Sequence, residues 1–300
     1  MVNAMGTFSR SWSLTKASWG VLREDKELIA LPVISSIASL ILVSPFFAIA
    51  ALTLSTNEGT AGTTTTSSAD GISLGIPGYI ALFLAYIVVA YVTIFFQSAL
   101  ILAANERMTG GDPTLKSALR GARANAAHIL PWAIISATVS IVLQAIQERA
   151  GFIGKIVIGL VGLAWTLVTM LVLPILVIEG VGLKDAFTRS ASAFKRTWGE
   201  NVVGNGAIGL ISALVMFAGI IVGIGIIVLG ASTGLWPISL IGAILMVIWI
   251  LFVSVFSTAL SGIFRTALYR YAMFGESSLG FDQDLIEHAF KPKKPGTTSA

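Results

Sequence analysis

The sequence predicts an all-α protein, a polytopic membrane bundle of six transmembrane helices with short amphipathic helices on one side of the membrane. Two observations indicate this fold class. Hydrophobic residues make up 55% of the 300 residues and charged residues only 11%, whereas a soluble chain carries about 25% charged residues. The charges are also bunched, and the stretches between them have the length that a membrane crossing requires. This composition excludes an ordinary water-soluble enzyme.

Five stretches of the chain contain no Asp, Glu, Lys or Arg. Crossing about 30 Å of hydrocarbon takes about 20 helical residues. The first four stretches each fit one span, and the fifth fits two because Ser232–Pro237 combines a turn signal with an interfacial type of Trp. The stretches are residues 28–57, 71–105, 125–147, 156–178 and 201–264.

The basic residues lie almost entirely on one side of the expected membrane. An even number of spans puts both termini on the same side, and 17 of the 19 Lys and Arg residues fall there. Only Arg149 and Lys155 lie opposite. The positive-inside rule therefore places both termini in the cytoplasm. Six helical spans favour a bacterial or archaeal plasma membrane over an outer membrane.

Three copies of one unit are expected along the chain. Residues 8–20 match residues 187–199 without gaps at seven of thirteen positions. Both segments precede an outward-going span, and a third such segment begins with the related residues 115–118. Copies that start on the same side are parallel repeats.

The expected units are an amphipathic helix followed by a helical hairpin. Their approximate bounds are residues 6–104, 114–178 and 183–274, within a single membrane domain over residues 1–290. Residues 291–300 are expected to form a disordered basic tail.

Aromatic residues at helical spacing mark the first helix of two units, with basic residues on the flanks. Such a helix suits the headgroup region of an anionic inner leaflet, where each basic residue contributes about 1 kcal/mol. The alternative is that the aromatic stripe packs on the protein's own bundle. The candidate lipid-interface anchors are Phe8, Trp12, Trp19, Phe187, Phe194 and Trp198.

Four charged residues stand at the ends of spans that share the basic side. Glu106 and Glu179 end the second and fourth spans, where a solvated or salt-bridged role competes with a role in transport. Arg265 and Arg270 end the sixth span, and Arg265 is placed to meet either acid. These residues are expected to serve as interfacial anchors or to form a headgroup site. The headgroup site is considered because one guanidinium group can bind two phosphate oxygens.

Other residues within the expected spans are uncharged. Gln97, Gln144 and Gln147 are expected to form hydrogen bonds between helices, with a sparse pore lining as the alternative. Gly219 and Gly223 form a small-xxx-small pattern that favours close packing within the bundle over self-dimerisation.

No signature of catalysis, metal or cofactor binding is found. The chain has no Cys, and its two histidines, His128 and His288, lack the spacing of a metal site. Phosphate-binding loops and nucleophile motifs are also missing. The excess of basic residues follows from their membrane side and does not indicate nucleic-acid binding.

Three motifs carry a resemblance to a known family. They are residues 8–12 with Lys16, residues 25–28 leading to Pro32, and residues 267–272 followed by Gly275 and residues 280–282. With these motifs the chain resembles a prokaryotic family of six-span membrane proteins known as a domain of unknown function, and the resemblance covers nearly the whole chain. It also looks distantly similar to the membrane domain attached to some glycerophosphodiester phosphodiesterases, which implies a lipid-facing role without supplying a catalytic residue.

Three functions are weighed. The first is a non-enzymatic plasma-membrane module that binds anionic inner-leaflet lipids or scaffolds a complex with a protein partner or a second copy. The second is a permease or channel for a small or lipid-like solute, which a continuous polar cavity near Gln97 and Gln144 would favour. The third is a membrane-embedded enzyme acting on lipid, which requires Glu106, Glu179 and Arg265 within hydrogen-bond reach of one another.

Overall fold

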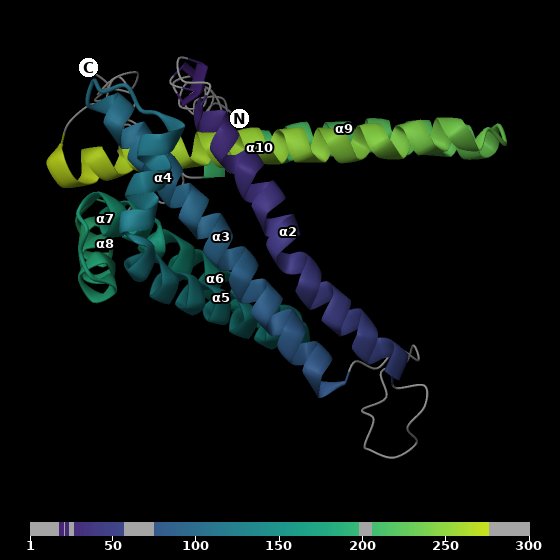
Figure 1. Ribbon diagram of the computed structural model, residues 1–300, viewed down its shortest axis with the longest axis horizontal. Coiled ribbons are helices and arrows are strands. Elements are labelled where there is room, and N and C mark those ends of the chain that lie inside the picture. The colour runs from purple at the N-terminus through teal and green to yellow at the C-terminus, as the bar shows by residue number, and fades with distance from the viewer. Residues whose placement is uncertain (1–17, 21, 24–26, 57–74, 198–205, 276–300) are drawn as a thin grey trace, which may run out of the picture.

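The computed structural model describes residues 18–20, 22–23, 27–56, 75–197 and 206–275, and within them the regular secondary structure is helical throughout (Figure 1). The prediction of an all-α fold is therefore confirmed. The helices are α2 (Glu27–Thr56), α3 (Ile76–Met108), α4 (Leu115–Ala124), α5 (Ala126–Arg149), α6 (Phe152–Thr169), α7 (Val172–Ile178), α8 (Leu183–Thr197), α9 (Gly206–Ser232) and α10 (Trp236–Phe274).

Among the described residues, six helical segments are long and apolar enough to cross a membrane, as the sequence predicts. They are Leu28–Thr53, Ile76–Met108, Ala126–Arg149, Phe152–Ile178, Ser212–Ser232 and Trp236–Phe274. The long fifth stretch is indeed divided, since α9 and α10 are separated by a turn in which Gly234 has a φ of 69°. A positive φ of this kind costs glycine little.

The fourth span is interrupted, where the sequence predicts one helix. The chain leaves the helix at Met170 and Leu171, between α6 and α7. Pro174 explains the break, because proline has no N–H to donate to the carbonyl four residues earlier, that of Met170, and its ring clashes with that carbonyl. The short helix α7 that follows is buried over Val172–Val177.

The buried core lies at one end of the molecule. This end is here called the basic end, because the helix segments that pack there carry the basic residues Arg107, Lys116, Arg120, Arg123, Lys184, Arg189 and Arg270. The last turns of α3 and α10 pack there against α7 and the short helices α4 and α8, with side chains such as Leu100, Ile175 and Leu268 almost fully buried. The pairs α2–α3 and α9–α10 diverge from the basic end (Figure 1). Their outer halves expose large apolar side chains to the surroundings.

Short helices precede the long pairs in chain order. Helix α4 comes before α5 and α6, and α8 comes before α9 and α10. Thr114 caps α4 through a reciprocal pair of hydrogen bonds with Ser117, and Gly121 admits Leu102 of α3 at close range. This order agrees with a short helix followed by a hairpin, while the threefold repeat itself stays a prediction.

Candidate functional site

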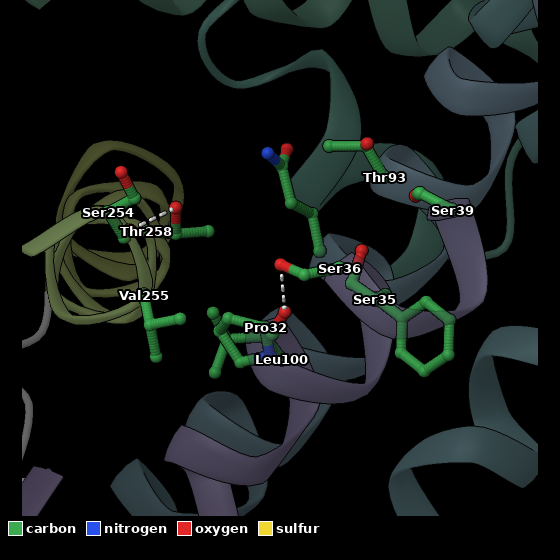
Figure 2. Close-up of a pocket in the computed structure, with 11 residues that line it drawn as sticks. Pro32, Ser35, Ser36, Ser39, Thr93, Leu100, Ser254, Val255 and Thr258 are labelled. Atoms are coloured by element: carbon green, nitrogen blue, oxygen red, sulfur yellow. Dashed lines mark hydrogen bonds between the residues drawn. The ribbon is translucent and has the colours of Figure 1, made fainter. Parts of the chain in front are cut away.

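A cavity of about 220 Å³ lies between α2, α3 and α10, inside segments that are otherwise apolar. Hydroxyl groups dominate its lining. Figure 2 shows Ser36 of α2 and Thr93 of α3 on one side and Ser254 and Thr258 of α10 on the other. The full lining is Pro32, Ser35, Ser36, Ser39, Thr93, Phe96, Gln97, Leu100, Ser254, Val255 and Thr258.

A second cavity of about 170 Å³ adjoins the first towards the basic end. The two share Gln97 and Thr258, and the second ends at Arg265. We call the polar residues of both cavities the polar seam. Its members are Ser35, Ser36, Ser39, Thr93, Gln97, Ser254, Ser257, Thr258, Ser261 and Arg265.

Helical spacing brings these side chains together. On α10 each seam residue from Ser254 to Arg265 has another seam residue three or four positions away, so they share one face of the helix. On α3, Thr93 and Gln97 are one turn apart. Gly262 lets α3 approach this face of α10, because a Cβ at Gly262 would lie 2.4 Å from Cδ2 of Leu100.

Part of the seam is satisfied by hydrogen bonds within the protein. Ser36 donates to the Pro32 carbonyl at 3.0 Å, Thr258 donates to the Ser254 carbonyl at 2.8 Å, and Ser257 and Ser212 share a hydrogen bond of 2.9 Å. Within the described part of the chain, Gln97 and Arg265 receive neither a hydrogen bond nor an ion pair. The side chains of Gln97 and Arg265 can therefore donate hydrogen bonds to water or to a polar ligand in the seam.

The depth of the seam follows from helix geometry. At about 1.5 Å per residue, Ser254 lies about 27 Å and Arg265 about 44 Å along α10 from Trp236, where the helix begins. Gln97 lies about 31 Å along α3 from Ile76. If α10 enters the membrane at Trp236 and crosses about 30 Å of hydrocarbon, these lengths would put the seam near the hydrocarbon boundary of the basic end, with Arg265 beyond that boundary, on the headgroup side.

The two expected acids have other partners than Arg265. Glu179 pairs with Arg189 and accepts a hydrogen bond from the hydroxyl of Tyr269 at 3.0 Å. Glu106 accepts a hydrogen bond of 3.4 Å from Ser117. In the described residues neither acid has a hydrogen bond or ion pair with Arg265. The structure thus does not bring the three predicted residues into one catalytic cluster.

Arg270, the other arginine near the end of α10, does not line either cavity. Its guanidinium donates to the Asn105 side chain of α3 at 3.2 Å, so it links α10 to α3 at the basic end.

Two of the expected aromatic anchors can be placed. Trp19 is 47% exposed and stacks on Phe256 of α10 with ring centroids 5.5 Å apart. Phe187 is 36% exposed, and its ring lies 6.1 Å from that of Trp165. Both therefore contact the bundle on one side and the surroundings on the other. Phe8, Trp12, Trp198 and the side chain of Phe194 lie outside the described residues.

The glycine pair lies at a helix contact. A Cβ at Gly219 would stand 1.8 Å from Nε1 of Trp249, and one at Gly223 would stand 2.7 Å from Cβ of Met246. Both glycines of α9 thus face α10.

Gln144 and His128 contribute nothing to the seam. Gln144 is exposed on α5, where it donates to Glu148 at 3.3 Å. The described residues contain no group of three or more His, Cys, Asp or Glu side chains able to hold a metal.

Sequence reasoning missed most of the polar seam. It identified Gln97 and Arg265 but passed over the Ser and Thr residues of α10, although their helical spacing is readable in the sequence. It also missed Tyr269 and Arg189 as the partners of Glu179, because these pairings depend on how α7, α8 and α10 meet.

Comparison with known proteins gives one match. No curated protein and no solved structure matches the chain. The distant likeness to the membrane domain of glycerophosphodiester phosphodiesterases accordingly stays a prediction. The model of a family of unknown function (DUF6159) matches residues 76–280. This match begins at α3 and covers the Arg265 end of the seam, but not α2. Since it spans more than half of the chain, the protein belongs to this family.

Proposed function

We propose that the protein is a non-enzymatic, lipid-interacting membrane module whose polar seam receives the headgroup of a bilayer lipid. The observation that carries this proposal is a cavity lined by hydroxyl groups between apolar spans. Ser36 and Ser254 are exposed at its edge, so the seam is open to the surroundings of the bundle. Apolar side chains such as Phe83 of α3 and Leu251 of α10 are exposed on the diverging helices, where acyl chains would cover them.

The length of the seam favours a binding site over a transport path. From Ser254 to Arg265 it extends about 17 Å along α10, about half of the hydrocarbon thickness. Beyond Ser254 the exposed side chains of α10 towards the outer end are large and apolar, among them Ile248, Leu251 and Phe252. Gln144, which a permease with a continuous polar cavity would use, lies elsewhere. A permease is therefore the second candidate, and only the presence of a cavity at Gln97 favours it.

Exposed cations at the basic end fit a lipid-interacting role. Lys116, Arg120 and Arg123 of α4 and Lys184 of α8 are exposed beside the membrane spans. In an anionic leaflet each contributes about 1 kcal/mol of attraction. We accordingly propose that the basic end faces the cytoplasm of a prokaryotic cell and that anionic inner-leaflet lipids are the partners. A scaffolding role with a protein partner or a second copy is compatible with the same surface.

Filling the seam tests the proposal. Ser254→Leu is expected to place an apolar side chain in the cavity and to reduce severalfold the lipid that stays with the protein after purification in a mild detergent. Lipid is measured by extraction and mass spectrometry. The matched control is Ser140→Leu on α5, an exposed serine outside the seam that bonds only to the Ser136 carbonyl of its own helix. Equal lipid content in both variants and the wild type would overturn the proposal.

A further inference from the structure

We propose that the Arg265 end of the polar seam is a phosphate site, which in the membrane holds the phosphate ester of a lipid headgroup. The proposal rests on the function proposed above and adds the chemical class of the ligand. Arg265 lines the second cavity together with Gln97, Ser257 and Ser261. Its volume of about 170 Å³ is well above the roughly 10–15 Å³ that a single water needs, which leaves room for a phosphate group.

The residue types in the lining favour an anion. No Asp or Glu is among the residues that line either cavity. The groups available are hydroxyls, the carboxamide of Gln97 and the guanidinium of Arg265, all of which can donate hydrogen bonds. A cation would find no charged ligand here, whereas an anion would find donors and one positive charge.

Arg265 needs an anion that the described protein does not supply. Arg265 is partly buried and stands in the chain between the buried residues Phe264 and Thr266. The two acids that the sequence offers as its partners bond to other residues. Glu179 is held by Arg189 and Tyr269, and Glu106 by Ser117. Leaving a partly buried charge without a counter-ion is unfavourable, so an outside anion would stabilise the site.

Phosphate fits both the geometry and the depth. The planar guanidinium presents a fork of N–H donors that matches two phosphate oxygens, and such charge-assisted pairs are stronger than neutral hydrogen bonds. At headgroup depth the bilayer itself provides phosphate esters in abundance. Basic pockets between spans on the cytoplasmic side are a recurrent way of binding phosphate headgroups.

The test compares three probes on the full-length protein in detergent. These are phosphatidylglycerol, a phosphate-free galactosyl diacylglycerol with the same acyl chains, and inorganic phosphate. Binding is measured by native mass spectrometry for the lipids and by the shift in thermal unfolding for phosphate. The variants are Arg265→Gln and Arg265→Lys, with Arg149→Gln, an exposed cation at the end of α5, as the matched control.

The wild type is expected to bind phosphatidylglycerol at least about tenfold more tightly than the phosphate-free lipid. Arg265→Gln is expected to lose this preference, Arg265→Lys to keep part of it, and Arg149→Gln to keep all of it. If Arg265→Gln fails to fold, two results still test the phosphate site. These are the preference of the wild type for phosphatidylglycerol and the weaker preference expected of Arg265→Lys.

Other outcomes separate the two proposals. Inorganic phosphate that stabilises the wild type through Arg265, without any preference for phosphatidylglycerol, would uphold the phosphate site and overturn its lipid source. A second outcome is that the wild type and Arg265→Gln bind both lipids equally well and that Ser254→Leu binds neither. This outcome would overturn the phosphate site and leave the proposed function intact. Retention of neither lipid by any variant would overturn both proposals.

Discussion

Replacing Tyr269 with Ala is expected to cost about 3–5 kcal/mol of stability, as truncation of a large buried aromatic residue does. Tyr269 is fully buried at the basic end, and its hydroxyl donates to Glu179 at 3.0 Å. Glu179 also pairs with Arg189 of α8, so one carboxylate links the end of α7 to both α8 and α10. Losing the ring removes packing from the core and one of the two partners of a mostly buried acid.

Smaller changes at the same place separate packing from hydrogen bonding. Tyr269→Phe keeps the ring and is expected to cost about 1.5–3 kcal/mol, the usual worth of a hydrogen bond to a charged group. Tyr79→Ala, at a tyrosine of α3 that is 61% exposed, is the matched control and should leave stability nearly unchanged. The measurement is the midpoint of thermal unfolding in detergent, followed by circular dichroism. A cost for Tyr269→Ala no greater than that for Tyr79→Ala would contradict the packing described here.

A single added methyl group at Gly219 is expected to destabilise the α9–α10 pair. Gly219→Ala would place Cβ 1.8 Å from Nε1 of Trp249, a distance that no real contact allows. The indole must then move and give up its hydrogen bond to the Val215 carbonyl, which is 3.2 Å long. Overpacking of this kind costs about 1–3 kcal/mol.

The same helix offers a matched control for this substitution. Gly225→Ala meets no atom within 4 Å, so it is expected to be neutral or slightly stabilising because alanine favours the helix. Thermal unfolding in detergent measures both variants. If the two alanine variants unfold at the same temperature, Gly219 does not set the distance between α9 and α10.

The spans could be predicted from the sequence because the transfer of a charged side chain into hydrocarbon is strongly unfavourable. Stretches free of charge located all six, and the turn at Ser232–Pro237 divided the last two as the structure does. The break at Met170 was missed although Pro174 is visible in the sequence. Proline in a membrane helix is often tolerated, so its presence alone does not distinguish a kink from a break.

The site could be predicted only in part. A charge stands out within an apolar chain, and Arg265 was identified for that reason. Serine and threonine do not stand out, because they also donate to the carbonyl one turn earlier in their own helix, as Thr258 does. The partners of Glu179 depend on where α8 and α10 meet, and a charge pattern carries no information about that junction.

The most direct test of the polar seam as a lipid site is a cryo-EM structure of the protein in phosphatidylglycerol nanodiscs. The expected result is one lipid with its phosphate at hydrogen-bond distance, about 2.7–2.9 Å, from the Arg265 guanidinium. Its acyl chains should lie against the apolar faces of α3 and α10, and the hydroxyls of the seam should surround the headgroup. A seam closed by side chains, or one that continues past Ser254 as a polar channel to the outer end, would contradict this account.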